Sequence, residues 1–293
     1  MKKLSIIIVN YNTKDVLKDC LSNLKDVYGD FEIIVVDNAS NDGSAEMVKN
    51  EFKGILLIEN DKNKGLAAAN NLGYSIAGGE YLLYLGSDAF PNKKTIKGVI
   101  DFMDANKEVG ISTCKLVLRD GRIDRDAHRG FPTPWASITY FIGLNKIFPK
   151  SKLLNRYFLG YQNMEVPHEI DMCISHFMMV RRDVFNTIGN WDEDFFLYGE
   201  DVDFCYRTKK AGWKIMYLPQ FEAVHYKGVT VGVRKTSSDI SPASVETKKL
   251  ARDNTVKAMK LFYSKHYKKV YPAVVTVLVL AGIKLMEKIR ARR

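Results

Sequence analysis

The sequence predicts an α/β fold with a doubly wound, mostly parallel central sheet, flanking helices and a C-terminal helical tail that associates with a membrane. Apolar runs rich in Val, Ile and Leu alternate with amphipathic stretches over the first hundred residues. Such continuous runs are typical of parallel strands that helices cover on both faces. The 293 residues, 46% of them hydrophobic, are enough for one large core. Positive charge is concentrated in the last 46 residues, which sets the tail apart from the sheet.

The predicted elements follow one another in a regular order. The apolar segments LSIIIVN, FEIIVVD, ILLIEN and YLLYLG predict strands at residues 4–10, 31–37, 55–60 and 81–86. Helical patterns separate these strands near residues 14–27, 43–52 and 66–77. Further along, the sequence predicts a strand at 177–180, a short helix, a helix near 200–211, and strands at KIMYLP and EAVHY.

Three regions are expected along the chain. Residues 1–228 form the sheet domain, 229–262 a linker with a helix, and 263–293 a basic tail. Within the first region, residues 119–170 are less regular and rich in proline, aromatic and basic residues. We expect this stretch to be an insertion that covers the substrate on its acceptor side.

The net charge of +10 is unevenly distributed. Residues 248–293 contain 13 Lys and Arg but only two acidic residues, so the rest of the chain is close to neutral. A nucleic-acid-binding protein would spread positive charge over its body, so no nucleic-acid partner is expected. The four cysteines are widely separated and form no metal-binding pattern, which fits a reducing cytoplasm. The first residues predict a strand rather than a signal peptide, because polar Asn10 and Asn12 interrupt the apolar run.

Polar residues follow three of the predicted parallel strands. Asn10 to Asn12, Asp37 with Asn38, and Asp88 occupy these strand ends. In doubly wound sheets ligands bind beyond the carboxyl ends of strands, so these groups are expected to line one crevice. Asp37 either stabilises a strand-to-helix turn or accepts the imide N–H of a pyrimidine base.

Three further residues have both a structural and a functional interpretation. Asp88 either caps a turn or binds a divalent cation that bridges a diphosphate, although Gly86 leaves no second carboxylate two residues earlier. Lys64 and the small residues after it either begin a helix or form an anion site with the helix amides. His225 is either structural or a contact to metal or phosphate.

Residues 190–213 contain the densest group of acidic residues. Glu200, Asp201 and Asp203 begin a predicted helix, where acids stabilise the helix dipole whatever their function. Asp192 to Asp194 precede aromatic residues, and packing against apolar rings raises a carboxyl pKa, as suits a general base. The sequence favours a functional interpretation of this group.

Five segments together resemble the family-2 glycosyltransferases of the GT-A fold, particularly their rhamnosyltransferase-like branch. They occur in the expected order and span roughly residues 4–228: IIIVNYN, VVDNASNDGS, NKGLAAANN, YLGSDAFP and RRDVFNTIGNWDEDFFLYGEDVDFCYRTKKAGW. RGFPTPW, at 129–135, is similar to a stretch near the acceptor side in that branch.

The resemblance implies a role for each matching residue. The donor-binding residues would be Tyr11, Asn12, Asp37, Lys64, Gly65, Asn70 and Ser87. Asp88 and His225 would bind Mg²⁺ or Mn²⁺, and Asp201 would be the catalytic base. The acceptor-side candidates are Glu200, His176, Trp191 and Arg129. The chain departs from the family pattern at Gly86, where Asn or Asp is usual, and at Ser175 with His176, where a Gly-Ala pair is frequent.

These features predict an inverting glycosyltransferase of cell-surface polysaccharide assembly. The expected partners are a nucleotide-sugar donor, with dTDP-rhamnose first and a UDP-sugar second, and a saccharide acceptor. The alternative is a non-catalytic nucleotide-sugar-binding module. A dinucleotide-dependent oxidoreductase is excluded, because VNYNTKD after the first strand contains no glycine.

The tail contains an apolar run at 273–283 between basic flanks. A membrane-spanning helix needs about 20 apolar residues, so this run is too short to cross. It forms either a buried core helix or an interfacial anchor, and the flanking tyrosines and lysines favour an anchor on an anionic membrane surface. We therefore expect a cytoplasmic protein, peripheral on the inner face of the cell membrane, with a polyprenyl-diphosphate-linked acceptor.

Overall fold

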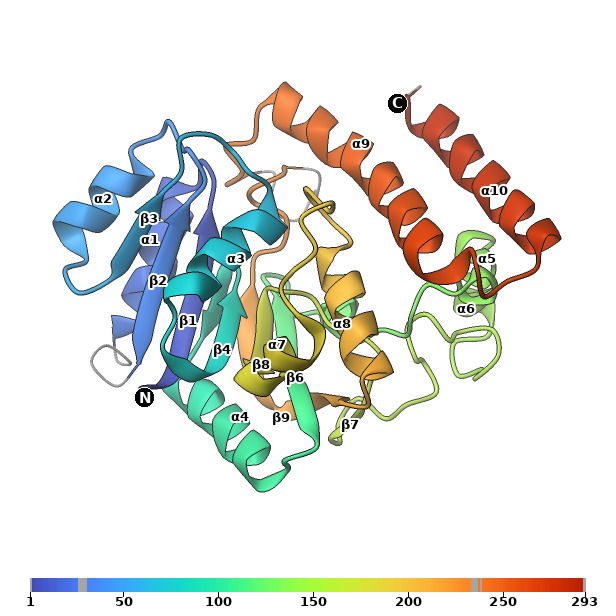
Figure 1. Ribbon diagram of the computed structural model, residues 1–293, viewed down its shortest axis with the longest axis horizontal. Helices are drawn as coiled ribbons and strands as arrows, with labels where there is room; N and C mark the ends of the chain where they lie inside the picture. The colour runs from blue at the N-terminus through green and yellow to red at the C-terminus, as the bar shows by residue number, and fades with distance from the viewer. Residues whose placement is uncertain (1, 26–30, 233–236, 238, 292–293) are drawn as a thin grey trace.

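The computed structural model describes residues 2–25, 31–232, 237 and 239–291, and it confirms the predicted α/β architecture. A mixed sheet runs through the centre in the order β3-β2-β1-β4-β8-β6-β9-β5, and the short β7 pairs with β9. Helices cover both faces of this sheet, and a long helical hairpin at the C-terminus lies along one side (Figure 1).

The first four strands of the sheet are parallel, as predicted. They are β1 (Lys2–Asn10), β2 (Glu32–Asp37), β3 (Leu56–Glu59) and β4 (Gly79–Leu85). The connecting helices are α1 (Lys14–Asn23), α2 (Ser44–Glu51) and α3 (Leu66–Ile76). The last two residues of the helix expected at 14–27 lie outside the described part of the chain. This arrangement brings the carboxyl ends of the four strands to one edge of the sheet.

The second half of the sheet is mixed. It contains β5 (Ala89–Pro91), α4 (Lys93–Ala105), β6 (Val109–Leu118), β8 (Phe177–Arg181) and β9 (Lys214–His225). β8 runs antiparallel to both β4 and β6, and β9 runs parallel to β6. The prediction of two strands at KIMYLP and EAVHY was wrong: they form the single strand β9, because an irregularity in the β6–β9 register absorbs the residues between them.

The insertion at 119–170 is more ordered than its sequence indicated. It contains the 3-10 turn η2 (Arg125–Ala127), α5 (Pro134–Phe141), α6 (Leu144–Ile147) and β7 (His168–Glu169). Pro134 stands in the first turn of α5, where its missing N–H costs nothing, and the Thr133 side chain accepts from the Ala136 amide. Pro134 therefore begins a helix instead of preventing one.

Two helices follow β8 in the sheet region, one lies in the region predicted as a linker, and one lies in the tail. They are α7 (Arg182–Ile188), α8 (Glu200–Lys210), α9 (Val245–Phe262) and α10 (Ala273–Ala291), with the π-helical turn η4 (Tyr263–Tyr267) after α9. A small apolar cluster that includes Phe195, Phe262 and Tyr267 joins the tail to the α8 region. Within the described residues, no helix is long and apolar enough to cross a membrane.

Candidate active site

The carboxyl ends of β1 and β2 are joined by a buried hydrogen-bond network. The Asn10 side-chain amide donates to Asp37 Oδ2 (3.0 Å), and the backbone N–H of Ser40 donates to Asp37 Oδ1 (2.8 Å). Asp37 is only 3% exposed. Its two oxygens offer about four lone-pair sites, so these two bonds leave capacity for a further donor. The turn and the base-binding interpretations of Asp37 are therefore compatible.

Tyr11 and Asn12 line an open cleft of about 330 Å³ at this edge. Asn12 has a positive φ of 52°, and its side-chain carbonyl accepts from the Asn41 backbone N–H (2.7 Å). The opposite wall comes from the region predicted as a linker: Thr230, Pro242, Ala243, Ser244 and Thr247. The linker therefore contributes to the site, which nothing in its composition indicated.

The start of α3 packs tightly against the loop before α8. Gly65 has φ +84°, and a Cβ atom there would lie 2.5 Å from the Phe196 carbonyl oxygen, so only glycine fits. The Leu66 backbone N–H donates to that same carbonyl (2.8 Å). Lys64 extends outward and pairs with Asp61 at 3.5 Å. Asn70 is 3% exposed, and its side-chain N–H₂ has no hydrogen-bond partner, which leaves a buried donor in this region.

Ser87 and Asp88 follow β4 and meet two different groups. The Ser87 hydroxyl lies 3.3 Å from that of Thr13, which donates to Asn10, so Ser87 extends the network at the end of β1. Asp88 faces two imidazoles: its Oδ1 lies 3.5 Å from His225 Nε2 and 3.7 Å from His176 Nε2.

Asp88, His176 and His225 can together hold a divalent cation. One ligand atom from each residue lies within 4.8 Å of the others, and Asp88 and His225 are almost fully buried. His225 Nε2 is buried and has no hydrogen-bond partner. A cation about 2.1 Å from each ligand places neighbouring ligand atoms roughly 3 to 3.5 Å apart; the 3.5 and 3.7 Å separations from Asp88 come close to this, whereas the 4.8 Å limit of the whole set is wider. The residues therefore fit a metal ion.

Asp124, which the sequence analysis did not single out, orients His225. Its Oδ2 lies 2.8 Å from His225 Nδ1, and its Oδ1 accepts from Lys227. Metal-binding histidines regularly bond a carboxylate through their second nitrogen, which fixes the ring orientation. Asp124 is separated from His225 by 101 residues in sequence, so no local motif could reveal the pair.

The carboxylates around this cluster stabilise positive charge, which a proton on His225 supplies at neutral pH and a metal ion would supply in its place. Burial alone would lower the pKa of His225, but Asp88 and Asp124 together raise it to about 9. Burial lowers the pKa of His176 to about 4, and the charge of His225 adds to this effect. Although burial opposes it, His225 and His176 hold the pKa of Asp88 well below its usual range. The carboxylates of Asp88 and Asp124 are therefore ionised at neutral pH.

Gly86 provides the space that His176 occupies. A Cβ atom at Gly86 would lie 2.6 Å from His176 Cδ2 and 3.0 Å from Asp88 Oδ1. The Gly86 N–H also donates to the His176 carbonyl (3.1 Å). The two departures from the family pattern are thus in contact, and the imidazole lies where a side chain at residue 86 would project. The structure places His176, predicted on the acceptor side, beside Asp88 and His225 in the cluster that could hold a cation.

Glu200 and Asp201 form a buried carboxylate pair at the start of α8. They are 3% and 8% exposed. Burial, with the charge of Asp201 as a second cause, raises the pKa of Glu200 to about 8. Burial also raises the pKa of Asp201, but the Arg129 guanidinium, 3.5 Å from its Oδ2, opposes this. The arrangement therefore concentrates the negative charge of the pair on Asp201.

A series of polar contacts links the carboxylate pair to the histidine cluster. Arg129 contacts Asp201 and donates through Nε to the Asp126 carbonyl (2.8 Å). The Asp126 carboxylate pairs with Lys227 at 2.6 Å, and Lys227 also pairs with Asp124. The segment around η2 thus connects the residue that orients His225 to the residue beside the predicted base.

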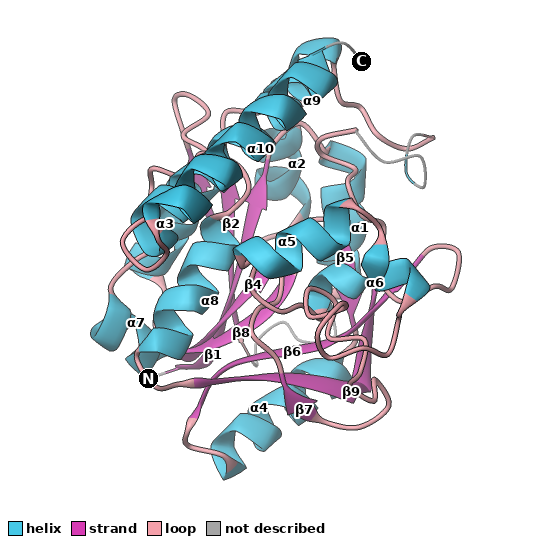
Figure 2. Cartoon of the chain, turned by 90° about the vertical axis from the view of Figure 1, so that its right-hand side faces the viewer, coloured by secondary structure: helices cyan, strands magenta, loops and turns pink. Residues whose placement is uncertain are grey.

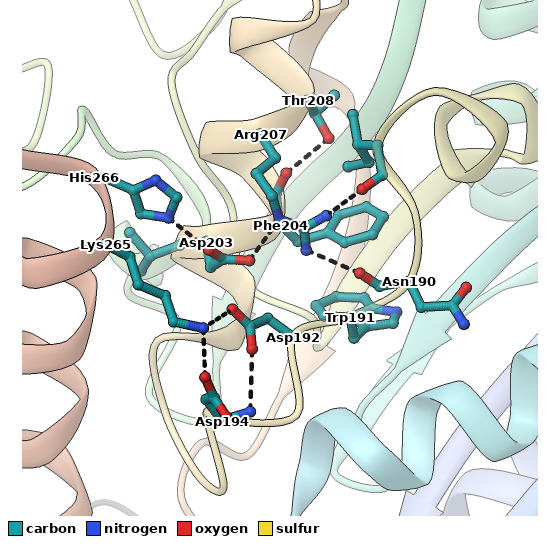
Figure 3. A network of polar contacts seen from close by, with 12 residues as sticks. Asn190, Trp191, Asp192, Asp194, Asp203, Phe204, Arg207, Thr208, Lys265 and His266 are labelled. Carbon is teal, nitrogen blue, oxygen red and sulfur yellow. Dashed lines mark hydrogen bonds and ion pairs between the residues drawn. The ribbon is translucent and has the colours of Figure 1, made fainter.

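The other acids of the α8 motif hold the tail, as Figure 3 shows. His266 Nε2 lies 2.6 Å from Asp203 Oδ1, and Arg207 donates to Asp203 Oδ2 (2.7 Å). Lys265 pairs with Asp192 and with Asp194. Lys265 also lies over the Phe195 ring, so Asp192 and Asp194 have a cationic partner beside an aromatic ring, which the sequence did not indicate.

Trp191 belongs to the core. It is 2% exposed, stacks on Phe204 with ring centroids 4.4 Å apart, and meets Tyr84 edge-on at 4.7 Å. The Asn71 side chain fixes its backbone by donating to its carbonyl and accepting from its N–H, each at 3.0 Å. The ring therefore supports the loop before α8 from beneath and presents no surface to an acceptor.

The half of parallel strands, the mixed half and the helices on both faces form the GT-A fold. The chain belongs to glycosyl transferase family 2, whose family model matches residues 5–189. The predicted resemblance is thereby confirmed.

Individual relatives agree with this class. The chain is 29% identical to rhamnosyltransferase WbbL of Escherichia coli strain K12 over 231 residues, which cover 75% of this chain and 82% of that protein. It is 36% identical over 110 residues to UDP-Glc:alpha-D-GlcNAc-diphosphoundecaprenol beta-1,3-glucosyltransferase WfaP of Escherichia coli, covering 36% and 43% of the two chains. A solved structure, mannosyltransferase PcManGT from Pyrobaculum calidifontis in complex with GDP-Man and Mn²⁺, shares the fold with a TM-score of 0.53 at 16% identity, covering 97% of this chain and 80% of that one.

Proposed function

We propose that this glycosyltransferase transfers a sugar with inversion from a nucleoside-diphosphate donor to the hydroxyl group of a saccharide acceptor. The single observation that supports this most strongly is the polar connection from the Asp88–His176–His225 cluster to the buried Asp201. This connection joins the histidine cluster, assigned to the charged leaving group, to Asp201, assigned as the base for the acceptor.

The donor nucleotide is assigned to the edge formed by β1, β2 and α3. Asp37 has lone pairs left for the base, and Tyr11 and Asn12 line the adjoining cleft. Lys64, at the exposed start of α3, can approach a phosphate, and the buried amide of Asn70 offers an unused donor. Gly65 allows α3 to pack closely against Phe196, and Ser87 contacts Thr13 at the end of β1, so both residues shape the assigned donor site.

Asp88, His176 and His225 would hold the divalent cation. Bound there, Mg²⁺ or Mn²⁺ would neutralise charge that develops on the leaving diphosphate. Two imidazoles and one carboxylate make a softer ligand set than an all-oxygen site, so we propose Mn²⁺ as the better-matched ion. Asp124 keeps the His225 ring oriented, and Lys227 adds a positive charge beside it.

Asp201 is assigned as the general base. It takes the proton of the acceptor hydroxyl while that oxygen forms a bond to the anomeric carbon, and the bond from this carbon to the diphosphate oxygen breaks on the opposite face. Arg129 favours the ionised form of Asp201. Glu200, whose pKa lies near 8, carries a proton at neutral pH and can donate a hydrogen bond to the acceptor. We therefore assign Arg129 and Glu200 to the acceptor side.

The relatives suggest the substrates. Rhamnosyltransferase WbbL supports a deoxysugar donor, for which dTDP-rhamnose is the first choice and a UDP-sugar the second. The name of the WfaP relative supports a polyprenyl-diphosphate-linked acceptor in surface-polysaccharide assembly. Such an acceptor is embedded in the membrane, so we propose a peripheral location on its inner face, reached through the tail at 263–293.

A donor panel tests this proposal. The thermal midpoint is measured with dTDP-, UDP- and GDP-sugars, with and without Mn²⁺, and one base and sugar should give the largest Mn²⁺-dependent increase. Asp201→Asn should retain that increase but lose about 10²–10⁴-fold in turnover. Stabilisation without transfer by the wild type would favour a non-catalytic nucleotide-sugar-binding module, and near-normal turnover of Asp201→Asn would refute the assigned base.

A further inference from the structure

The α5–α6 hairpin exposes large apolar side chains to an unusual extent. Soluble proteins rarely present contiguous apolar patches of this kind unless the patch binds something. The exposed fractions are Trp135 46%, Ile138 50%, Phe141 50%, Ile142 64%, Ile147 68%, Phe148 49% and Leu153 64%. This surface belongs to the insertion at 119–170, which the sequence predicted only as a cover for the substrate.

A second exposed apolar stripe lies on α10. Thr276 and Ile283 face inward, and the Tyr263 hydroxyl lies 3.0 Å from that of Thr276. The outward side chains are Val274 71%, Val277 66%, Leu278 65%, Leu285 59% and Ile289 48% exposed, and Val270 in the preceding turn is 66% exposed. The helix is therefore held by one side only.

The two surfaces lie on the same side of the molecule. α10, α5 and α6 occupy the right-hand side of Figure 1, and Figure 2 looks directly onto that side. Ring contacts connect them: Phe131, just before α5, meets Tyr206 at 5.2 Å, and Tyr206 meets Tyr267 of the tail at 5.7 Å. α5, α6 and α10 thus lie on one side of the molecule, and we call their exposed surface the docking face.

Positive charge accompanies the apolar side chains. Residues 128–164 contain five Lys and Arg and no Asp or Glu, and Lys146, Lys150 and Lys152 are exposed. In the tail, Lys284 and Lys288 are exposed near the apolar stripe. Aromatic rings, aliphatic side chains and lysines together match a bilayer interface with anionic headgroups, where rings and aliphatic groups enter the acyl boundary and lysines remain at the phosphates.

We propose that α5–α6 and α10 together form a two-part docking face for an anionic lipid bilayer. The tail alone was expected to bind the membrane, whereas the structure assigns an equal part to the insertion. A second copy of this chain fits less well, because it would bring the lysines of one face against those of the other. An anionic membrane satisfies both the apolar and the charged groups of the face.

This docking face also gives the insertion a role in acceptor delivery, a consequence that rests on the proposed function. Tyr140 of α5 lies against Tyr157 with ring centroids 5.0 Å apart, and the Tyr157 hydroxyl accepts from Arg129 (3.2 Å). Arg129 in turn contacts Asp201. The bilayer surface and the assigned base are therefore connected through a few side chains, and a lipid-linked sugar would approach Asp201 from the docking face.

Vesicle co-sedimentation of the full chain tests the proposal. The vesicles contain phosphatidylcholine with or without about 30% phosphatidylglycerol, an anionic fraction chosen to give a strong surface potential. The test variant is Ile142→Glu/Ile147→Glu, and the control is Leu56→Glu/Ile76→Glu, which changes two aliphatic residues of 43% and 46% exposure on β3 and α3. Because all four side chains are exposed, none of the substitutions disturbs the core.

The test variant should bind anionic vesicles at least about tenfold more weakly than the wild type, since two aliphatic contacts with the acyl boundary are lost. The control should bind like the wild type, and binding should weaken from 0.1 to 0.5 M NaCl. Asp201→Asn should also bind normally, so a failed catalytic assignment would leave this result unaffected. The proposal would be overturned if the test variant bound the vesicles like the wild type or if the wild type did not bind them. It would also be overturned if the wild type formed a concentration-dependent dimer that the test variant abolished.

Discussion

The contact between Gly86 and His176 gives the sharpest test of the metal site. In Gly86→Ala the new Cβ would lie 2.6 Å from His176 Cδ2, whereas carbon atoms pack at about 3.5 to 4.0 Å. The imidazole must therefore move by roughly 1 Å. Metal–ligand distances tolerate about 0.2 Å, so this movement removes His176 from the coordination sphere.

The expected loss of Mn²⁺ affinity is at least 10- to 100-fold, because disturbing even an outer-shell partner of a metal ligand costs about that much. Affinity is measured from the electron paramagnetic resonance signal of free Mn²⁺ during titration, which does not depend on turnover. Gly282→Ala is the control, since a Cβ atom at that glycine meets nothing within 4 Å.

A double-mutant cycle with His176→Ala separates ligand displacement from general disturbance. If Ala at residue 86 acts by moving His176, the two single variants lose similar affinity and the double variant loses no more than either. Gly86→Asp/His176→Ala should recover binding, because it supplies a carboxylate in the space that the ring vacates. Wild-type affinity in Gly86→Ala, or additive losses in the cycle, would refute the reasoning.

Three further outcomes are expected. Arg129→Gln should move the rising limb of the kcat/KM pH profile to higher pH, because the Arg129 guanidinium opposes the raised pKa of Asp201 and the base acts only when it is ionised. Arg129→Lys keeps the positive charge and should move this limb less. An unmoved limb in Arg129→Gln would exclude the contact from catalysis. Asp124→Asn should weaken Mn²⁺ binding about 10- to 100-fold in the same titration, and an unchanged affinity would contradict its orienting role. Trp191→Ala should lower the free energy of unfolding, measured by urea denaturation, by about 3–5 kcal/mol, because the ring is buried in the core. Trp191→Phe should leave the KM for the acceptor unchanged. A raised KM in that variant would show that Trp191 contacts the acceptor.

Much of the fold was predictable because its signals are local. The strands β1 to β4 and the helices between them follow from apolar runs and helical periodicity, and their ends fall within a few residues of the prediction. Parallel pairing then requires their carboxyl ends to meet, which brought Asn10, Asp37 and Asp88 to one edge. The irregular β6–β9 register was not predictable, because it depends on a partner strand about a hundred residues away.

The acidic motif shows where local reasoning reaches its limit. Residue type and spacing did not separate Asp192, Asp194, Glu200, Asp201 and Asp203, and only the resemblance to the family singled out Asp201 as the base and Glu200 on the acceptor side. The structure divides them according to their partners: Lys265 and His266 of the tail contact three of them, whereas Glu200 and Asp201 remain in a buried pair beside Arg129. Those partners come from segments distant in sequence, and a carboxyl pKa depends on the charges around it.

The sequence by itself determined the α/β sheet and the polar groups at its strand ends, because strand periodicity is a property of the chain alone, and its ordered motifs carried the resemblance to the family-2 glycosyltransferases. Only the tertiary structure decided that His176 joins Asp88 and His225 in the space left by Gly86, that Asp124 orients His225, and that the insertion shares an apolar, basic face with the tail. Coordination and surface apposition depend on distances between residues far apart in sequence, and packing sets those distances.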